Sequence, residues 1–117
     1  MISDADRLLA HLDHLRQEAG TAIRFVSGMD KDAFLADSFA QHAVGMCLVN
    51  IGEAATRIMD RHAGFAEAHP DIPWQDIRRM RNRVAHGYHD VNFGRVWDTV
   101  QAYLPDLLDK LPPSPES

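Results

Sequence analysis

The sequence contains a single cysteine, Cys47, so no disulfide bond can form within the chain. It also lacks any apolar run near the roughly 18–20 residues that a membrane-spanning helix needs. Residues 1–6 carry two aspartates and no basic group, which is not the basic-then-apolar order of a secretory signal. These absences favour a reducing compartment, and we expect a cytoplasmic protein without a membrane anchor.

The net charge of −5 argues at first against a nucleic-acid partner, but the charge is unevenly distributed. Residues 74–95 hold five arginines against two aspartates, whereas the rest of the chain holds seven basic and fifteen acidic residues. A local basic patch on an acidic body can hold a phosphate backbone. Arginines that merely keep a helix solvated would give the same pattern, and charge alone does not separate the two interpretations.

No segment alternates apolar and polar residues as a strand does, and apolar residues recur at helical spacing along the chain. With 117 residues, of which 45% are hydrophobic, the chain can build one core. We therefore expect an all-α fold, a four-helix up-down bundle in a single domain over residues 1–111. The expected helices cover residues 3–26, 30–59, 73–86 and 92–111.

Local signals mark the ends of these helices. Ser3 and Asp6 have the spacing of a capping box, which predicts the start of the first helix. Pro105 predicts a kink or break in the last helix, because proline removes a backbone donor. The proline-rich tail at 112–117 is expected to be disordered.

Gly45 and Gly52 stand seven residues apart on one side of the second helix. Each lowers helix propensity by about 1 kcal/mol relative to alanine, so close approach of another helix is the expected compensation. That helix could belong to the same chain or to a second copy. Cys47 lies in the same apolar stretch, and we expect an inert core thiol there.

The apolar stripe of the third helix contains a charged residue. On a helical wheel Arg81 falls between Trp74 and Ile77, within the face that should be buried. An unpaired buried guanidinium is costly, so Arg81 needs an acidic partner or faces a wet cleft. A functional arginine and a structural arginine in an ion pair both remain open.

His86 lies about 140° from Arg81 on this wheel, so the two do not share one face of a straight helix. Asn82, four residues earlier, lies on the side of His86 and could orient its imidazole. Arginine and histidine would converge if the helix unwound toward Gly87, or if a second copy presented its own pair across a symmetric interface. Together they suffice to cleave RNA without a metal, because the nucleophile is the 2′-hydroxyl of the RNA.

The pattern Arg81-Asn82-x-x-x-His86-x-Tyr88 resembles the R-x4-H-x-Y signature of HEPN ribonuclease toxins of the HepT family. The resemblance covers nearly the whole chain. Residues 51–55 are similar to the second-helix motif of the family, and residues 91–97 to the start of its fourth helix. The third helix and the turn after it are matched by residues 72–74, 80–83 and 86–88.

This resemblance implies a symmetric homodimer whose motif segments face each other across a cleft and act as a metal-independent endoribonuclease. In such a toxin Arg81 would stabilise the transition state, His86 would be the general acid–base, and Asn82 would position His86 or a phosphate oxygen. The expected partner is an MntA-like antitoxin of the nucleotidyltransferase fold, which neutralises the toxin by transferring AMP to Tyr88. Because Tyr88 follows the helix end at Gly87, we expect its hydroxyl to be accessible.

Other residues have weaker assignments. Arg78, Arg79 and Arg83 are candidate contacts to RNA phosphates, with a solvated helix face as the alternative. Glu53 could support the same cleft from the second helix, although an ion pair between packed helices is the favoured role. A non-catalytic HEPN module that binds RNA, a nucleotide or a partner subunit is the competing function.

Seven histidines raise the question of a metal site. Di-metal helical bundles use Glu-x-x-His pairs, and this sequence contains no such pair. His11 and His14, which have helical spacing, are expected to lie on the surface. We therefore expect neither a metal nor another cofactor.

Overall fold

The computed structural model describes residues 1–113, and that part of the chain contains helices and no strands. The predicted all-α fold is confirmed. The long helices are α1 (Asp4–Val26), α3 (Ser38–Arg61) and α5 (Trp74–His86), and shorter ones are α2 (Lys31–Leu35), α4 (Ala63–Ala68), α6 (Phe93–Asp98) and α7 (Leu104–Lys110). Two further turns, η1 (Tyr88–Asp90) and η2 (Thr99–Tyr103), complete the described structure.

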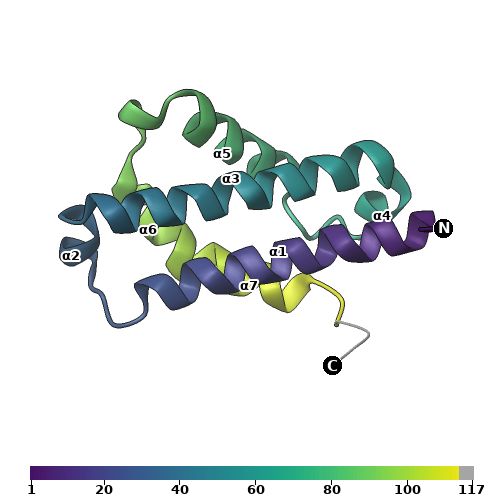
Figure 1. Cartoon of the computed structure of the whole chain (residues 1–117), viewed down its shortest axis with the longest axis horizontal. Coiled ribbons are helices and arrows are strands. Elements are labelled where there is room, and N and C mark those ends of the chain that lie inside the picture. The colour runs from purple at the N-terminus through teal and green to yellow at the C-terminus, as the bar shows by residue number, and fades with distance from the viewer. Residues whose placement is uncertain (114–117) are drawn as a thin grey trace.

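The longest buried helix, α3, runs through the middle of the molecule, with α1 on one side and α5 on the other (Figure 1). The C-terminal rod, which consists of α6, η2 and α7, packs against α1. Its position between α1 and α5 explains most of the apolar character of α3 between residues 43 and 51, although Met46 in this stretch is 59% exposed. Its buried residues include Leu48 and Ile51, both with no exposed surface. No helix in the described residues is both long and apolar enough to span a membrane.

The ends of α1 follow the predicted signals. The Ser3 hydroxyl accepts a hydrogen bond from the Asp6 amide at 3.1 Å, and the Ser3 amide donates to the Asp6 carboxylate at 3.3 Å. This capping box satisfies two amides that the first helical turn leaves without partners. After the helix, Gly28 has a φ of 89°, a left-handed conformation that side chains rarely adopt.

The prediction of one continuous helix over residues 30–59 is wrong. The chain breaks at Ala36 and Asp37, and the Asp37 carboxylate caps α3 by accepting from the Ala40 amide at 3.0 Å. The Gln41 side chain donates to the carbonyls of Phe34 and Leu35, which satisfies acceptors at the end of α2. Apolar spacing continues across this break, so periodicity alone could not locate it.

The irregularity expected at Pro105 lies one turn earlier. Residues 99–103 form a π-helical turn in which the Leu104 amide donates to the Thr99 carbonyl. Pro105 then occupies the first turn of α7, where its missing amide donor is tolerated. The widened turn therefore lets α6 and α7 form one bent rod instead of two separated helices.

The structure also bears on the predictions for Cys47 and for the C-terminal tail. Cys47 is buried, which confirms the predicted core position, and burial together with the nearby Glu18 carboxylate raises its pKa to about 11. The Pro112 carbonyl accepts a hydrogen bond from Arg16 on α1. The rest of the tail predicted to be disordered, residues 114–117, lies outside the described residues.

Candidate active site

Helix α5 carries the motif and is anchored through its apolar face. Trp74, Ile77 and Val84 are buried as predicted. The Trp74 indole also donates a hydrogen bond to the His69 carbonyl at 3.1 Å. These contacts fix the rotation of α5 about its axis, and with it the direction of every other side chain on the helix.

Arg81 faces α3, and its side chain is only 19% exposed. One terminal nitrogen lies 3.3 Å from the Glu53 carboxylate, whereas the buried Nε has no partner in the described structure. Gly52 makes this position possible, because a Cβ on Gly52 would lie 2.0 Å from the Arg81 Cβ. Arg81 therefore has the acidic partner that its burial requires, and Glu53 makes the favoured helix-packing ion pair.

The same contacts explain the two glycines. Gly52 faces Arg81, and a Cβ on Gly45 would lie 3.4 Å from the Tyr88 ring and 3.6 Å from Val84. The helix that approaches α3 closely is thus α5 of the same chain. Of the two possibilities left open by the sequence, the glycine face is used within the monomer.

His86 and Asn82 lie on the exposed side of α5. Helix α5 continues to His86 and ends at Gly87, so it does not unwind early enough to bring His86 round to Arg81. No hydrogen bond or ion pair among the described residues joins His86 to Arg81 or to Asn82. A single chain therefore does not bring the arginine and histidine of the motif together.

The expectation that the Tyr88 hydroxyl is accessible is wrong for this structure. The hydroxyl is buried and has no hydrogen-bond partner. The ring packs against His42, with centroids 4.7 Å apart, and against Phe93 at 5.4 Å. Turn η1 folds Tyr88 back onto the start of α3, where desolvation raises its pKa. A short turn after a helix end can return a side chain to the core, which the sequence position did not reveal.

The other motif-helix arginines differ in their partners. Arg78 pairs with Asp60 at 3.0 Å, and Arg79 pairs with Asp76 at 2.8 Å. Arg83 forms no ion pair with a described residue. Surface pairs of this kind contribute only about 0–1 kcal/mol, so Arg78 and Arg79 can exchange their partners for other anions at little cost.

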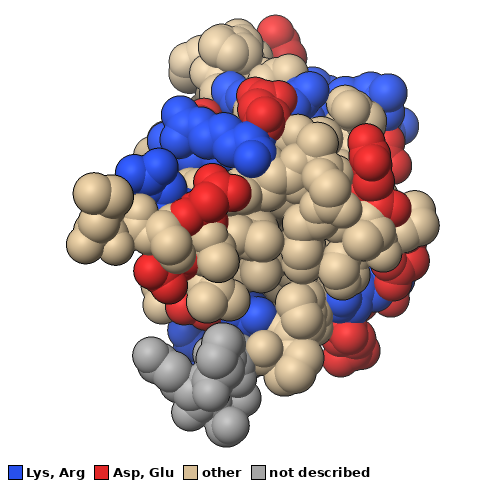
Figure 2. Space-filling model, turned by 90° about the vertical axis from the view of Figure 1, so that its right-hand side faces the viewer, with Lys and Arg blue, Asp and Glu red and all other residues tan. Residues whose placement is uncertain are grey.

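Positive and negative side chains are mixed on the side of the molecule that carries α5. Figure 2 shows lysine and arginine side chains gathered toward the side on which α5 lies in Figure 1, with acidic residues between them. Carboxylates interrupt the predicted basic patch, because Arg78, Arg79 and Arg81 pair with Asp60, Asp76 and Glu53 respectively. Any phosphate contact must come from particular arginines rather than from a uniform field.

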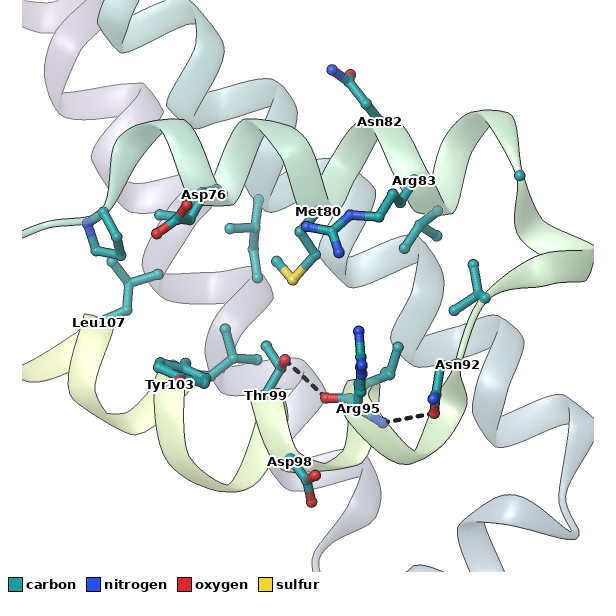
Figure 3. A pocket seen from close by; sticks show the side chains of 18 of the residues that line it. Asp76, Met80, Asn82, Arg83, Asn92, Arg95, Asp98, Thr99, Tyr103 and Leu107 are labelled. Carbon is teal, nitrogen blue, oxygen red and sulfur yellow. Dashed lines mark hydrogen bonds between the residues drawn. The ribbon is translucent and has the colours of Figure 1, made fainter.

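A groove of about 1000 Å³ separates α5 from the C-terminal rod. Its apolar floor includes Ile51 of α3, and His86, Arg83, Arg95 and Tyr103 border it. Arg83 and Arg95 project into the groove from opposite walls, whereas the Asn82 side chain points away from the rod (Figure 3). The groove was not predicted from the sequence, because apolar periodicity does not reveal which helices leave a gap instead of packing against each other.

The histidines form no metal site in the part of the chain that the structure describes, where no three metal-ligating side chains come together. His14 is exposed as expected, but His11 is partly buried, which corrects its placement on the surface. The His11 ring lies 5.7 Å from that of His62, and burial lowers the pKa of His11. Packing of α1 against the end of α3 accounts for this arrangement.

Comparison with known proteins matches residues 15–113 to the family described as HepT-like, Ribonuclease HepT-like. One relative is “Probable ribonuclease HepT” of Thermococcus cleftensis, 33% identical over 105 residues, which are 86% of this chain and 92% of the relative. Another is “Putative RNase TTE0752” of Caldanaerobacter subterraneus subsp. tengcongensis, 32% identical over 97 residues, or 83% and 84% of the two chains. No solved structure matches the chain.

Proposed function

Because this chain belongs to the HepT-like ribonuclease family, we propose that it is an endoribonuclease and the toxin of a toxin–antitoxin pair. The observation that carries the proposal is that the family match includes all of α5, on which Arg81 and His86 of the R-x4-H motif are both present. Its relatives in two other organisms are named as ribonucleases.

The chemistry needs no metal. His86 accepts the proton of an RNA 2′-hydroxyl, whose oxygen attacks the adjacent phosphorus while the bond from phosphorus to the 5′-oxygen breaks. The leaving 5′-oxygen takes a proton from a histidine, which gives a cyclic phosphate and a 5′-hydroxyl. Arg81 stabilises the charge on the phosphoryl oxygens, and Asn82 holds His86 or one of these oxygens. Glu53 contacts one terminal nitrogen of Arg81, so other donors of the guanidinium remain for the phosphate.

A homodimer could bring together the motif arginine and histidine, which a single chain keeps apart. Phe39 and Met46 are 85% and 59% exposed, and their spacing places them on the same face of α3 as Glu53, the partner of Arg81. Exposed apolar side chains on one helix face are typical of an interface. A symmetric dimer packed through this face would place two motif helices near one another. One His86 could then act as the base and the other as the acid.

The proposed antitoxin is an MntA-like nucleotidyltransferase that attaches AMP to Tyr88. The added phosphodiester would carry negative charge to the motif and compete with RNA for the arginines. Because the Tyr88 hydroxyl is buried, the antitoxin must first draw the three-residue turn η1 away from α3. Neutralisation by steric blocking in a stable complex would require no such movement.

The non-catalytic alternative has one specific observation in its favour. Within a single chain Arg81 is paired with Glu53 and makes no contact with His86, which is how a binding module with a structural arginine would look. A module of this kind would bind RNA, a nucleotide or a partner subunit without changing it. A dimer that cleaves RNA would distinguish the enzyme from the non-catalytic binding module.

Expression in bacteria tests the toxin proposal. The chain alone should arrest growth, and His86→Ala should abolish the arrest while the protein accumulates to the same level. Coexpression with a neighbouring nucleotidyltransferase gene should restore growth and add one or more AMP masses to the wild-type chain but not to Tyr88→Phe. Full toxicity of folded His86→Ala would refute the site, whereas neutralisation without added mass would refute only the role of Tyr88.

A further inference from the structure

The groove between α5 and the C-terminal rod has no occupant among the described residues. Helix α5 packs on α3, and the rod packs on α1 and α2, so the two walls stand apart, with Ile51 of α3 at the base of the groove between them. The floor is apolar and includes Ile51, Ile77, Met80 and Leu104. An apolar groove of about 1000 Å³ that stays open is large enough for part of a ligand chain.

Two positive charges face each other in this groove. The Arg83 and Arg95 side chains extend toward the groove from α5 and α6 respectively (Figure 3). Neither forms an ion pair with any residue in the range 1–113. Since two guanidinium groups repel each other, their common direction favours an anion placed between them.

The carboxylates around the groove do not cancel these charges, because three of the four are already paired. Asp76 lies 2.8 Å from Arg79, Asp98 lies 3.2 Å from Lys31, and Asp106 lies 2.7 Å from Lys110. Asp90 is the remaining acidic residue of the lining. The end of the groove that His86 borders therefore keeps a net positive charge from Arg83 and Arg95.

An exposed aromatic ring completes the site. Tyr103 is 65% exposed at the end of the π-helical turn and forms part of the wall opposite α5 (Figure 3). Proteins that bind single-stranded nucleic acid combine a positive groove with aromatic rings on which bases stack. A polypeptide ligand with acidic side chains would use the arginines equally well, but it would not require a solvent-exposed ring on the wall of the groove.

We propose that this groove binds single-stranded RNA, with one backbone phosphate between Arg83 and Arg95 and a base stacked on Tyr103. The inference rests on the proposed ribonuclease function and gives it a substrate path. The strand enters along the C-terminal rod and reaches His86 at the end of the groove. Arg95 and Tyr103 are binding residues in this scheme and take no part in the chemical step.

Binding can be measured apart from cleavage. The probe is a fluorescent single strand of about 12 nucleotides in which fluorine replaces each 2′-hydroxyl, so that the nucleophile is absent. Fluorescence anisotropy at several salt concentrations gives the affinity and its salt dependence. Circular dichroism melting of each variant checks that the fold is intact.

Arg95→Ala should weaken binding about 3- to 10-fold at 0.1 M salt and reduce the slope of log affinity against log salt by about 0.7. Tyr103→Ala should weaken it about 5- to 100-fold, and Tyr103→Phe should retain wild-type affinity because only the ring stacks. Arg7→Ala, which removes an exposed arginine of α1 far from the groove lining, is the matched control and should change neither quantity.

Wild-type affinity in folded Arg95→Ala and Tyr103→Ala would overturn the inference, and the ribonuclease proposal would survive if His86→Ala still abolished cleavage. Displacement of the probe by polyglutamate at equal charge concentration, with no effect of Tyr103→Ala, would instead identify a groove for acidic polypeptides. If the wild-type chain neither binds the probe nor cleaves RNA, the proposed function itself fails.

Discussion

Arg81 illustrates how one glycine sets the position of a charged side chain. The arginine enters the apolar interface between α3 and α5 because Gly52 leaves space where a side chain would otherwise stand. The guanidinium then reaches Glu53 at 3.3 Å. A glycine in the middle of a helix costs stability, and here it makes room for the arginine of the motif.

Gly52→Ala tests this packing. A methyl group 2.0 Å from the Arg81 Cβ must push α5 away from α3, so we expect a loss of about 1–3 kcal/mol in the free energy of unfolding and lower activity. Gly64→Ala in α4 is the control, because its added Cβ meets nothing within 4 Å and should be neutral or slightly stabilising. Urea denaturation measures both. Equal stability of the two variants would show that α5 is not held against Gly52.

At the scale of the helix, the sequence predicts which segments are helical better than it predicts where a helix is interrupted. The start of α1 and the apolar stripe of α5 were predicted from local signals, whereas the irregularity expected at Pro105 lies one turn earlier, in residues 99–103. The break between α2 and α3 was not, because Leu35 and Phe39 keep the four-residue spacing of one helix face across it. Its signal was Asp37, whose capping role becomes evident only when the chain turns there.

Some features of the candidate site could likewise be predicted from the sequence, and others could not. That Arg81 is buried and needs a partner follows from its place on the helical wheel, and an ion pair between packed helices was expected for Glu53, but the sequence did not join the two residues. The burial of Tyr88 could not be predicted, because it depends on the path of η1 and on contact with His42, which lies 46 positions earlier in the chain. The groove beside Arg95 and Tyr103 depends on two helices that remain apart, and no local pattern encodes that.

Asp37→Ala tests the side-chain cap with which α3 begins after the break. Loss of the cap leaves the Ala40 amide without its partner, so we expect a destabilisation of about 0.5–2 kcal/mol. Asp37→Asn keeps a side-chain acceptor and should stay within a few tenths of a kcal/mol of wild type. Thermal unfolding followed by circular dichroism compares the three proteins. A larger loss in the asparagine variant than in the alanine variant would contradict the capping role.

For the whole molecule, the proposed dimer determines whether the motif can work. We expect a species of twice the 13.1 kDa chain mass in sedimentation experiments at micromolar concentration. A Phe39→Glu, Met46→Glu double variant places two charges on the exposed apolar face of α3 and should sediment as a folded monomer. Leu9→Glu, on an exposed position of α1, should remain dimeric. A wild-type chain that sediments only as a monomer would exclude a shared site.

The most direct test of the account is cleavage of single-stranded RNA by the purified chain in EDTA. Wild type should yield products with a cyclic phosphate and a 5′-hydroxyl, because the 2′-hydroxyl is the proposed nucleophile and no metal takes part. His86→Ala should reduce the rate by about 10²–10⁴-fold with unchanged melting behaviour, as the loss of a general acid–base does. Cleavage that EDTA abolishes, or that folded His86→Ala performs at the wild-type rate, would contradict the account.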